Sequence, residues 1–154
     1  MGNPIVTTTS RSWQQITNLA AVLQGISLAN GYLTDVGQNI WTTDNQRTDE
    51  NALGIMLYSG DITSSPAERP AKAEREIEIY AEVAIATDQD DAHQQIHSVI
   101  EDVERCVTTY AKAQFAQPSV PTTPLRVGSI KILDRPEGAS VIVAVITVLA
   151  RYFR

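Results

Sequence analysis

The sequence predicts an α+β fold in which a mostly antiparallel β-sheet carries two α-helices on one face, in the order α-β-β-β-α-β-β. Three observations lead to this prediction. Apolar residues recur at helical spacing in two segments, they alternate with polar residues in a third, and two apolar runs near the C-terminus are joined by a turn-type sequence. Strands and helices do not alternate regularly, so a doubly wound parallel sheet is not expected. The 154 residues are enough for one domain, and we expect a single domain over residues 1–154.

A first helix is expected after Ser12, which is a suitable N-cap residue. Apolar residues recur at helical spacing up to Ile26, and an Asn-Gly pair at 30–31 marks the end of the helix. Residues 32–43 have no clean period and are an irregular strand candidate. Residues 53–58 predict a short strand.

Residues 60–73 are expected to form an exposed loop, because two prolines stand among alternating charges. From Arg75 the apolar period switches to two, which predicts a strand with one apolar and one acidic face. The apolar face would carry Ile77, Ile79, Ala81, Val83 and Ile85, and the other face Glu76, Glu78, Tyr80 and Glu82. We expect these acids to pair with cations on neighbouring strands, such as Arg126 or Lys131.

Acidic residues at 88–91 suit a helix N-terminus, where the macrodipole favours negative charge. The following stretch predicts a second amphipathic helix, whose apolar stripe is Ala92, Ile96, Val99, Ile100, Val103, Val107 and Tyr110. A linker over residues 117–124, which contains three prolines, leads to a strand over residues 125–133. A turn-type sequence at 134–138 joins this strand to the last one as a hairpin. Both helices are expected to cover the same face of the sheet.

The last strand, residues 141–150, is apolar at both parities and is expected to stop before Arg151. A strand sends alternate side chains to opposite faces, so this strand needs cover on both sides. Two arrangements remain open from the pattern. The strand lies in the centre of a sheet that is covered on both faces within one subunit, or a partner subunit covers its far face.

No metal site is expected. His93 and His97 stand four apart on the second helix and Glu101 continues their row, but no further ligand is indicated, and a solvated helix face is the simpler interpretation. The acids at 88–91 lack the glycine and the closing glutamate of a calcium loop, so helix capping explains them better.

No catalytic residue or cofactor is expected either, and we do not expect an enzyme. Cys106 falls on or beside the apolar stripe without a base in a nucleophile pattern, which indicates a small core residue. The glycines are scattered and form no phosphate-binding loop. The glutamates of the third strand lack a convergent partner for acid-base work.

The formal charge of −6 argues against a protein that holds nucleic acid through phosphate contacts. The N-terminus has neither a basic start nor an apolar core of a signal peptide, and the last apolar run is too short to cross a bilayer as a helix. A single cysteine cannot form an internal disulfide, which fits a reducing compartment.

Several short stretches of the sequence resemble those of a known protein family. They are Y-L-T-D-V-G at 32–37, R-E-I-E-I-Y-A-E-V at 75–83, I-H-S-V-I-E-D-V-E-R at 96–105 and L-R-V-G-S-I-K-I-L-D-R-P-E-G at 125–138, continued by the last strand. With the N-terminal helix, this order resembles the tail terminator and tail-completion proteins of tailed bacteriophages, the family of lambda minor tail protein U. The chain departs from the pattern at residues 49–58, where a Pro-led strand start would be expected.

The resemblance implies a structural virion protein without cofactor. It would form a ring, commonly a hexamer, at the head-proximal end of the tail tube, ending tube growth and offering a joining surface to the head or neck. Its partners would be further copies of itself, the tail tube protein and a connector or neck protein, and DNA would pass through the lumen without specific binding. Its location would be the tail or neck of the virion, after assembly in the bacterial cytoplasm, with no membrane partner.

This reading assigns roles to three groups of residues. Candidates for the subunit interface are Val141, Val143, Val145, Tyr152 and Phe153. Candidates for the docking loop are Arg47, Asp61, Glu68, Arg69, Lys72 and Arg75. Candidates for an acidic lumen are Asp88, Asp90 and Asp91. Two alternatives remain: another head-tail connector or neck ring protein, and a small-molecule-binding or enzymatic α+β domain, which would need a concave pocket with convergent polar groups.

Overall fold

The computed structural model of the chain describes residues 10–43, 53–64, 74–87, 91–115, 125–133 and 141–153. Its elements in chain order are α1 (Arg11–Leu23), the 3-10 turns η1 (Leu28–Asn30) and η2 (Val36–Gln38), β1 (Ile40–Trp41), β2 (Ile55–Ser64), β3 (Glu74–Ala86), α2 (Ala92–Phe115), β4 (Leu125–Leu133) and β5 (Val141–Phe153). The predicted α+β class and order of elements are confirmed.

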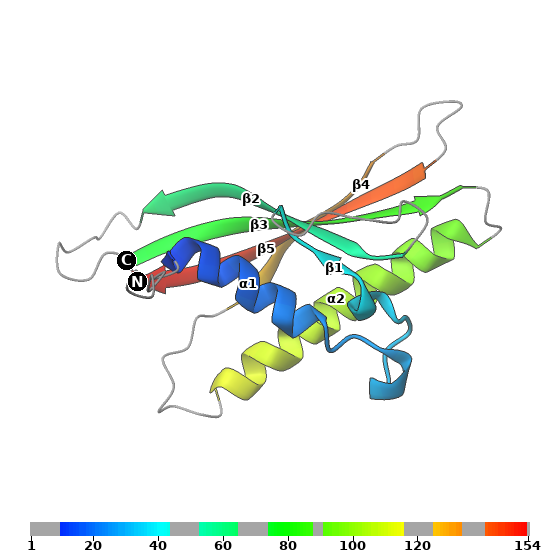
Figure 1. Ribbon diagram of the computed structural model, residues 1–154, viewed down its shortest axis with the longest axis horizontal. Coiled ribbons are helices and arrows are strands. Elements are labelled where there is room, and N and C mark those ends of the chain that lie inside the picture. The colour runs from blue at the N-terminus through cyan, green and yellow to red at the C-terminus, as the bar shows by residue number, and fades with distance from the viewer. Residues whose placement is uncertain are drawn as a thin grey trace, which may run out of the picture.

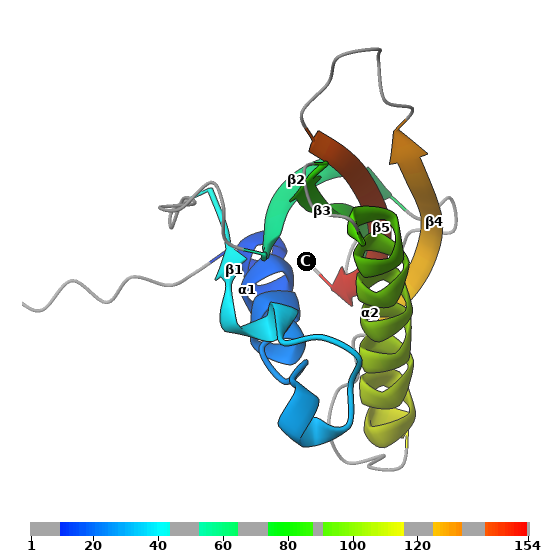
Figure 2. The same cartoon turned by 90° about the vertical axis from the view of Figure 1, so that its right-hand side faces the viewer.

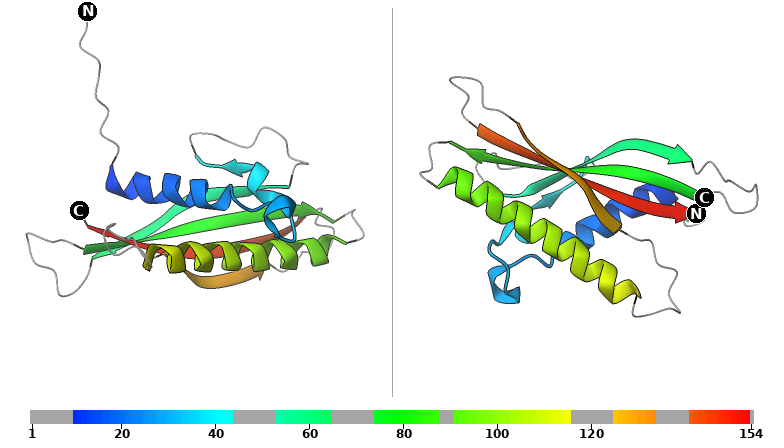
Figure 3. Two further views of the ribbon diagram at one scale, coloured as in Figure 1. Left: turned by 90° about the horizontal axis from the view of Figure 1, so that it is seen from below. Right: turned by 180° about the vertical axis from the view of Figure 1, so that it is seen from behind.

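The strands form one sheet in the order β1-β2-β3-β5-β4. All neighbouring strands are antiparallel except the short β1, which is parallel to β2. Both helices lie on the same face of this sheet, as expected (Figures 1 and 3). Figure 2 shows α1 beneath the side of the sheet that β1 and β2 form, and α2 beneath the side of β5 and β4. We call the opposite face, over which no described helix lies, the open face.

The hydrophobic core lies between this sheet and the helices. The apolar face predicted for β3 is confirmed, because Ile77, Ile79, Ala81, Val83 and Ile85 are all buried. The stripe predicted for α2 is buried as well, apart from Tyr110, which packs at its margin: Ala92, Ile96, Val99, Ile100, Val103 and Val107. From α1 the core receives Ile16, Leu19 and Leu23.

The first helix differs from its prediction at both ends. It begins one residue earlier than Ser12, and its N-cap is Ser10, whose side chain accepts a hydrogen bond from the Trp13 N–H at 3.3 Å. It ends at Leu23, so that Ile26 lies outside the helix although its side chain is fully buried. A buried apolar side chain need not belong to a helix. Ile26 therefore extended the helical period of the sequence beyond the residue at which the helix ends.

The chain after α1 turns back tightly against the helix end. The Gly37 N–H donates to the Ile26 carbonyl at 3.1 Å, and a Cβ at Gly37 would lie 2.5 Å from that oxygen. The irregular strand predicted for residues 32–43 is thus mostly wrong. This segment contains η2 and only the two residues of β1. Several of its backbone N–H groups donate to the carbonyls of Ile26 and Ser27, which follow α1, and to carbonyls within the segment.

The second strand is longer than predicted. Strand β2 begins at Ile55 and continues to Ser64, so residues 60–64 are strand rather than part of an exposed loop, and residues 65–73 lie outside the described residues. A bulge opposes Gly60 and Asp61 to a single residue, Glu78, on β3. The prediction failed here because backbone pairing with β3 needs no apolar side chains, and the polar sequence gave no strand signal.

The two C-terminal strands have their predicted starts, and β4 also has its predicted end. Strand β5 is longer than predicted: it continues through Arg151 and Tyr152 to Phe153, which pairs with Glu74 on β3. The predicted stop rested on a charged residue that the structure accommodates by ion pairs with β3. The turn predicted at 134–138 lies outside the described residues.

Candidate functional site

The two faces of β5 have different surroundings. Its even-numbered residues from 142 to 150 face the helices and are at most 2% exposed: Ile142, Ala144, Ile146, Val148 and Ala150. Its odd-numbered residues from Val143 to Leu149 point to the open face and are half-buried. Among the described residues, cover is therefore present on one face of this apolar strand only. The strand does not lie between two layers of the described subunit.

Three cross-strand rows organise the open face. Leu149 pairs with Glu78 on one side and with Arg126 on the other. Two residues along, Thr147 lies between Tyr80 and Ser129.

The third row places Val145 between Glu82 and Lys131. The apolar strip of β5 thus separates acids on β3 from bases on β4. Such a charge-segregated apolar surface is typical of protein contacts, in which the apolar part is desolvated and the charges fix orientation.

At one end of this face the acids and bases are already paired. The Glu76 carboxylate accepts a hydrogen bond from Arg151 Nε at 3.3 Å and lies 3.6 Å from Arg126 Nη2. Arg151 Nε also lies 3.9 Å from Glu74 Oε1. The arginine side chains are more than half exposed, so each pair contributes about 0–1 kcal/mol. The pairing expected for Arg126 is confirmed, whereas the ion pairs of the described residues do not include Lys131.

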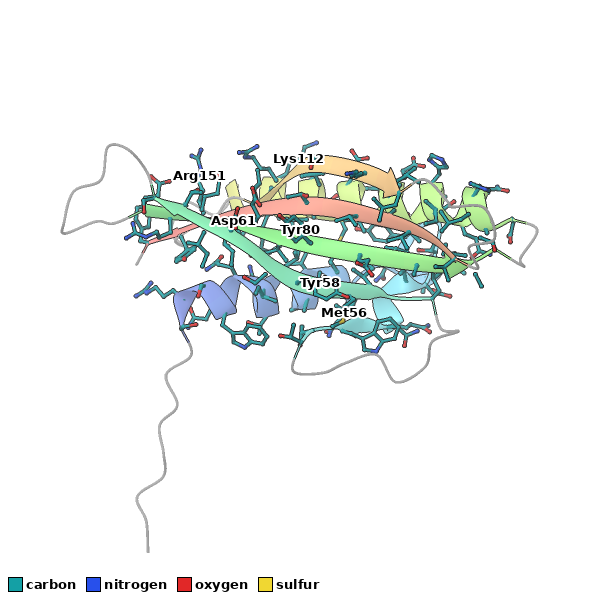
Figure 4. The ribbon with its side chains drawn as sticks, turned by 90° about the horizontal axis from the view of Figure 1, so that it is seen from above. Met56, Tyr58, Asp61, Tyr80, Lys112 and Arg151 are labelled. Atoms are coloured by element: carbon teal, nitrogen blue, oxygen red, sulfur yellow. The ribbon has the colours of Figure 1, made fainter. Side chains whose placement is uncertain are left out.

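The side of the open face near β2 is aromatic. Tyr58 and Tyr80 are cross-strand partners, and Met56 continues the row along β2 (Figure 4). The Tyr80 hydroxyl donates to Glu78 Oε2 at 2.9 Å, and this hydrogen bond raises the pKa of Tyr80. Gly60 leaves room for the Tyr80 ring, since a Cβ there would lie 2.8 Å from a ring carbon.

These aromatic residues were not among the predicted contacts. The signal that would have found Tyr58 and Met56 was their shared parity on β2, opposite to the buried Ile55 and Leu57.

The outer edge of β4 is apolar and exposed. Ile130 and Ile132 point to the helix side of the sheet, yet they are 38% and 40% exposed. Leu133, the last residue of β4, and Val141, the first of β5, are 41% and 43% exposed. Exposed apolar edge strands are sites of association with other strands.

The predicted contact residues are placed in separate parts of the sheet. Val143 and Val145 lie on the central strip of the open face, and Val141 lies at the start of β5. Tyr152 and Phe153 are residues of β5 rather than of a free tail; Tyr152 is half-buried and Phe153 is 57% exposed.

The residues predicted for the docking loop and the lumen are only partly described. Asp61 is a residue of β2 and Arg75 of β3, so both belong to the sheet and not to a loop. Asp91 lies directly before α2, where its carboxylate accepts a hydrogen bond from Gln95 Nε2 at 2.8 Å. The other residues of these groups lie outside the described part of the chain: Arg47, Glu68, Arg69, Lys72, Asp88 and Asp90.

The residues considered for chemistry do not form a site. His93, His97 and Glu101 are exposed on α2, and no group of metal-binding side chains occurs within the described ranges. Cys106 is buried, and its thiol donates to the Val22 carbonyl at 3.3 Å. Burial raises the pKa of this thiol, partly offset by a hydrogen bond with Tyr32, so it is held in the protonated form that is not nucleophilic.

One buried carboxylate was missed by sequence reasoning. Asp102 is 1% exposed and accepts hydrogen bonds from the Leu33 N–H at 2.9 Å, the Thr34 N–H at 2.8 Å and the Thr34 hydroxyl at 2.7 Å. Arg105 adds a hydrogen bond to the Gly31 carbonyl at 2.8 Å and lies 4.7 Å from the centre of the Tyr32 ring. Together these contacts fix the segment between η1 and η2 on α2.

No protein-family model matches the chain, and no curated protein is similar to it in sequence. None of the described helices is both long enough and apolar enough to span a membrane.

Proposed function

We propose that this protein is a structural component of a tailed-phage virion. It forms a ring, with six copies as the expected number, at the head-proximal end of the tail tube. The ring ends tube polymerisation and offers the joining surface for the head or neck, and DNA passes through its lumen. The sequence likeness to tail terminators motivates this assignment, and the observation that carries it is the open face of the sheet.

The open face supports the proposal because it has the composition of a contact surface. Its central strip consists of Val143, Val145 and Leu149, which are half-buried in the isolated chain. Covering the remaining apolar area stabilises a complex by about 25 cal/mol per Å². The flanking acids and bases discriminate between orientations of the partner. A virion protein can leave such a face open in the free subunit, since the face is covered only on assembly.

The overall charge also fits a passage for DNA. A formal charge of −6 gives the ring a negative potential, which repels phosphates and prevents the DNA from binding to the channel wall.

The test is the mass of the purified protein by light scattering behind a sizing column, over a concentration series, without and with the tail tube protein encoded by the same genome. Rings of several times 16.8 kDa, formed alone or on tubes, and tubes of defined length in the presence of the protein are expected. A chain that stays at 16.8 kDa and leaves tube length unchanged would refute the proposal.

A pair of variants tests the open face itself. Val145→Asp places a charge in the central strip and should abolish tube termination, while Thr109→Asp, on the exposed surface of α2, should not. Ring mass, measured in the same samples, separates two outcomes. If Val145→Asp still forms rings that fail to stop tube growth, the open face contacts the tail tube. If the variant forms no rings, the open face contacts the neighbouring subunit.

A further inference from the structure

Both edges of the sheet leave backbone groups for pairing. Strand β4 has β5 on its inner side, and among the described residues no strand lies on its outer side. Within the described ranges, strand β2 is covered on its outer side by β1 only at Ile55 and Met56. Its remaining outer edge therefore extends from Tyr58 to Ser64. Figure 4 shows β4 and β2 at opposite edges of the sheet. A free edge is a template for a further strand.

Both edges expose large apolar side chains to solvent. Ile130 and Ile132 on β4 are 38% and 40% exposed, and Ile62 on β2 is 48% exposed. Long exposed edge strands with apolar side chains associate with other strands unless charges, prolines or bulges prevent it. Beyond the bulge at Gly128, residues 129–133 of β4 contain one charged residue, Lys131. The free segment of β2 contains one of opposite sign, Asp61.

The directions of the strands allow the two edges to meet. Strand β2 is antiparallel to β3, β3 to β5, and β5 to β4, so β4 and β2 of one chain have opposite directions. A second copy placed beside β4 with its open face on the same side therefore presents β2 in the antiparallel orientation. This contact is head-to-tail, and a head-to-tail contact closes into a ring when its rotation permits.

The side chains of the two edges match in one register. With Asp61 opposite Lys131, both on the open face, Ile62 falls opposite Ile130 on the helix side. The next row pairs Thr63 with Ser129, again both on the open face. Opposite charges, two exposed isoleucines and two hydroxyl groups thus face each other in three consecutive rows. The match ends at bulges on both sides, at Gly60 of β2 and Gly128 of β4.

We propose that the outer edge of β4 pairs with the outer edge of β2 of the next copy of the chain, in this antiparallel register. The contact between two copies is argued independently of the proposed ring. Only the closure of successive contacts into a ring rests on the proposed function. It makes one continuous sheet through the assembly and turns every open face to the same side of it. Pairing of β4 with a second β4 is disfavoured, because it would bring Lys131 of both copies to one face of the joint.

Disulfide trapping tests this contact directly. The variant carries Asp61→Cys and Lys131→Cys in a Cys106→Ala background, and it is oxidised at a concentration at which the wild type assembles. Within one chain the two positions are separated by β3 and β5, about 14 Å at ordinary strand spacing, which is beyond the reach of a disulfide. The expected result is a ladder of linked chains whose highest band gives the ring size. Each single cysteine variant should remain one chain.

A charge exchange tests the same register without cysteine chemistry or a changed core. Asp61→Lys and Lys131→Asp should each raise the concentration needed for assembly about five-fold, and the double variant should restore it. Glu101→Lys, on the exposed face of α2, makes a comparable charge change and should have no effect.

The outcomes separate this pairing from the proposed function. Assembly of the wild type, with no ladder in the double cysteine variant and no rescue by the charge exchange, would overturn the edge pairing and leave the ring intact. Dimers linked through Lys131→Cys alone would overturn it in favour of β4 with β4. A wild type that never assembles would remove both proposals.

Discussion

At the scale of single residues, Asp102 is the one charged side chain that is buried among the described residues. Its carboxylate satisfies two backbone N–H groups and one hydroxyl within a site that is 1% exposed. Charge-assisted hydrogen bonds of this kind are roughly twice as strong as neutral ones. They explain why a segment of turns with little regular structure holds one position against α2.

Asp102→Asn should lower the free energy of unfolding by about 3 kcal/mol, because the amide turns a donor toward groups that are themselves donors. Urea denaturation followed by circular dichroism measures this change. Glu101→Gln, the exposed neighbour on the same helix, is the matched control and should shift stability by less than about 0.5 kcal/mol. Equal effects of the two variants would mean that the Asp102 contacts are not stabilising.

At the scale of elements, strand β5 shows how much a sequence pattern can decide. The alternation on β3 specified both the strand and its inner face, because polar and apolar residues separate by parity there. On β5 both parities are apolar, so the pattern predicted the strand but not which parity faces the helices. Packing of α1 and α2 against the even-numbered side decided this question.

Two adjacent substitutions on β5 test this assignment of faces. Ile142→Asp places a charge where the side chain is 2% exposed and should lower the free energy of unfolding by about 4 kcal/mol or more. Val143→Asp points to the open face and should lower it by about 1 kcal/mol. Thermal and urea unfolding of both variants give the comparison. The reverse order would mean that the open face is the covered one.

At the scale of the whole molecule, the two free edges bound the open face, and Lys131 and Asp61 lie on this face at its two margins. The open face has an apolar strip between acids and bases. Exposed isoleucines flank Lys131 on β4, and one exposed isoleucine, Ile62, stands beside Asp61 on β2. The proposed edge pairing leaves the open face available to another partner. One small sheet with helices on a single side can thus contact its neighbours and a further protein at once.

Salt should weaken assembly more than it weakens the fold. The contacts proposed between copies include Asp61 with Lys131 at an exposed edge, and ions screen such pairs over about 3 Å at 1 M salt compared with about 10 Å at 0.1 M. The core contains few charges, so the unfolding temperature should change little. Sizing and thermal unfolding at 0.05 and 0.5 M sodium chloride measure both. Assembly that strengthens with salt would indicate contacts dominated by apolar burial.

The sequence by itself determined the fold class, the order of elements, the inner face of β3 and the apolar stripe of α2. Each of these follows from the spacing of apolar residues within single segments of the chain. Only the tertiary structure decided the end of α1, the extension of β2 and β5, the buried contacts of Asp102 and the identity of the open face. These features depend on which distant segment lies opposite: backbone pairing with β3 extends polar strands, and the placement of both helices on one side leaves the other side of β5 open. A pattern along the chain carries no information on such partners.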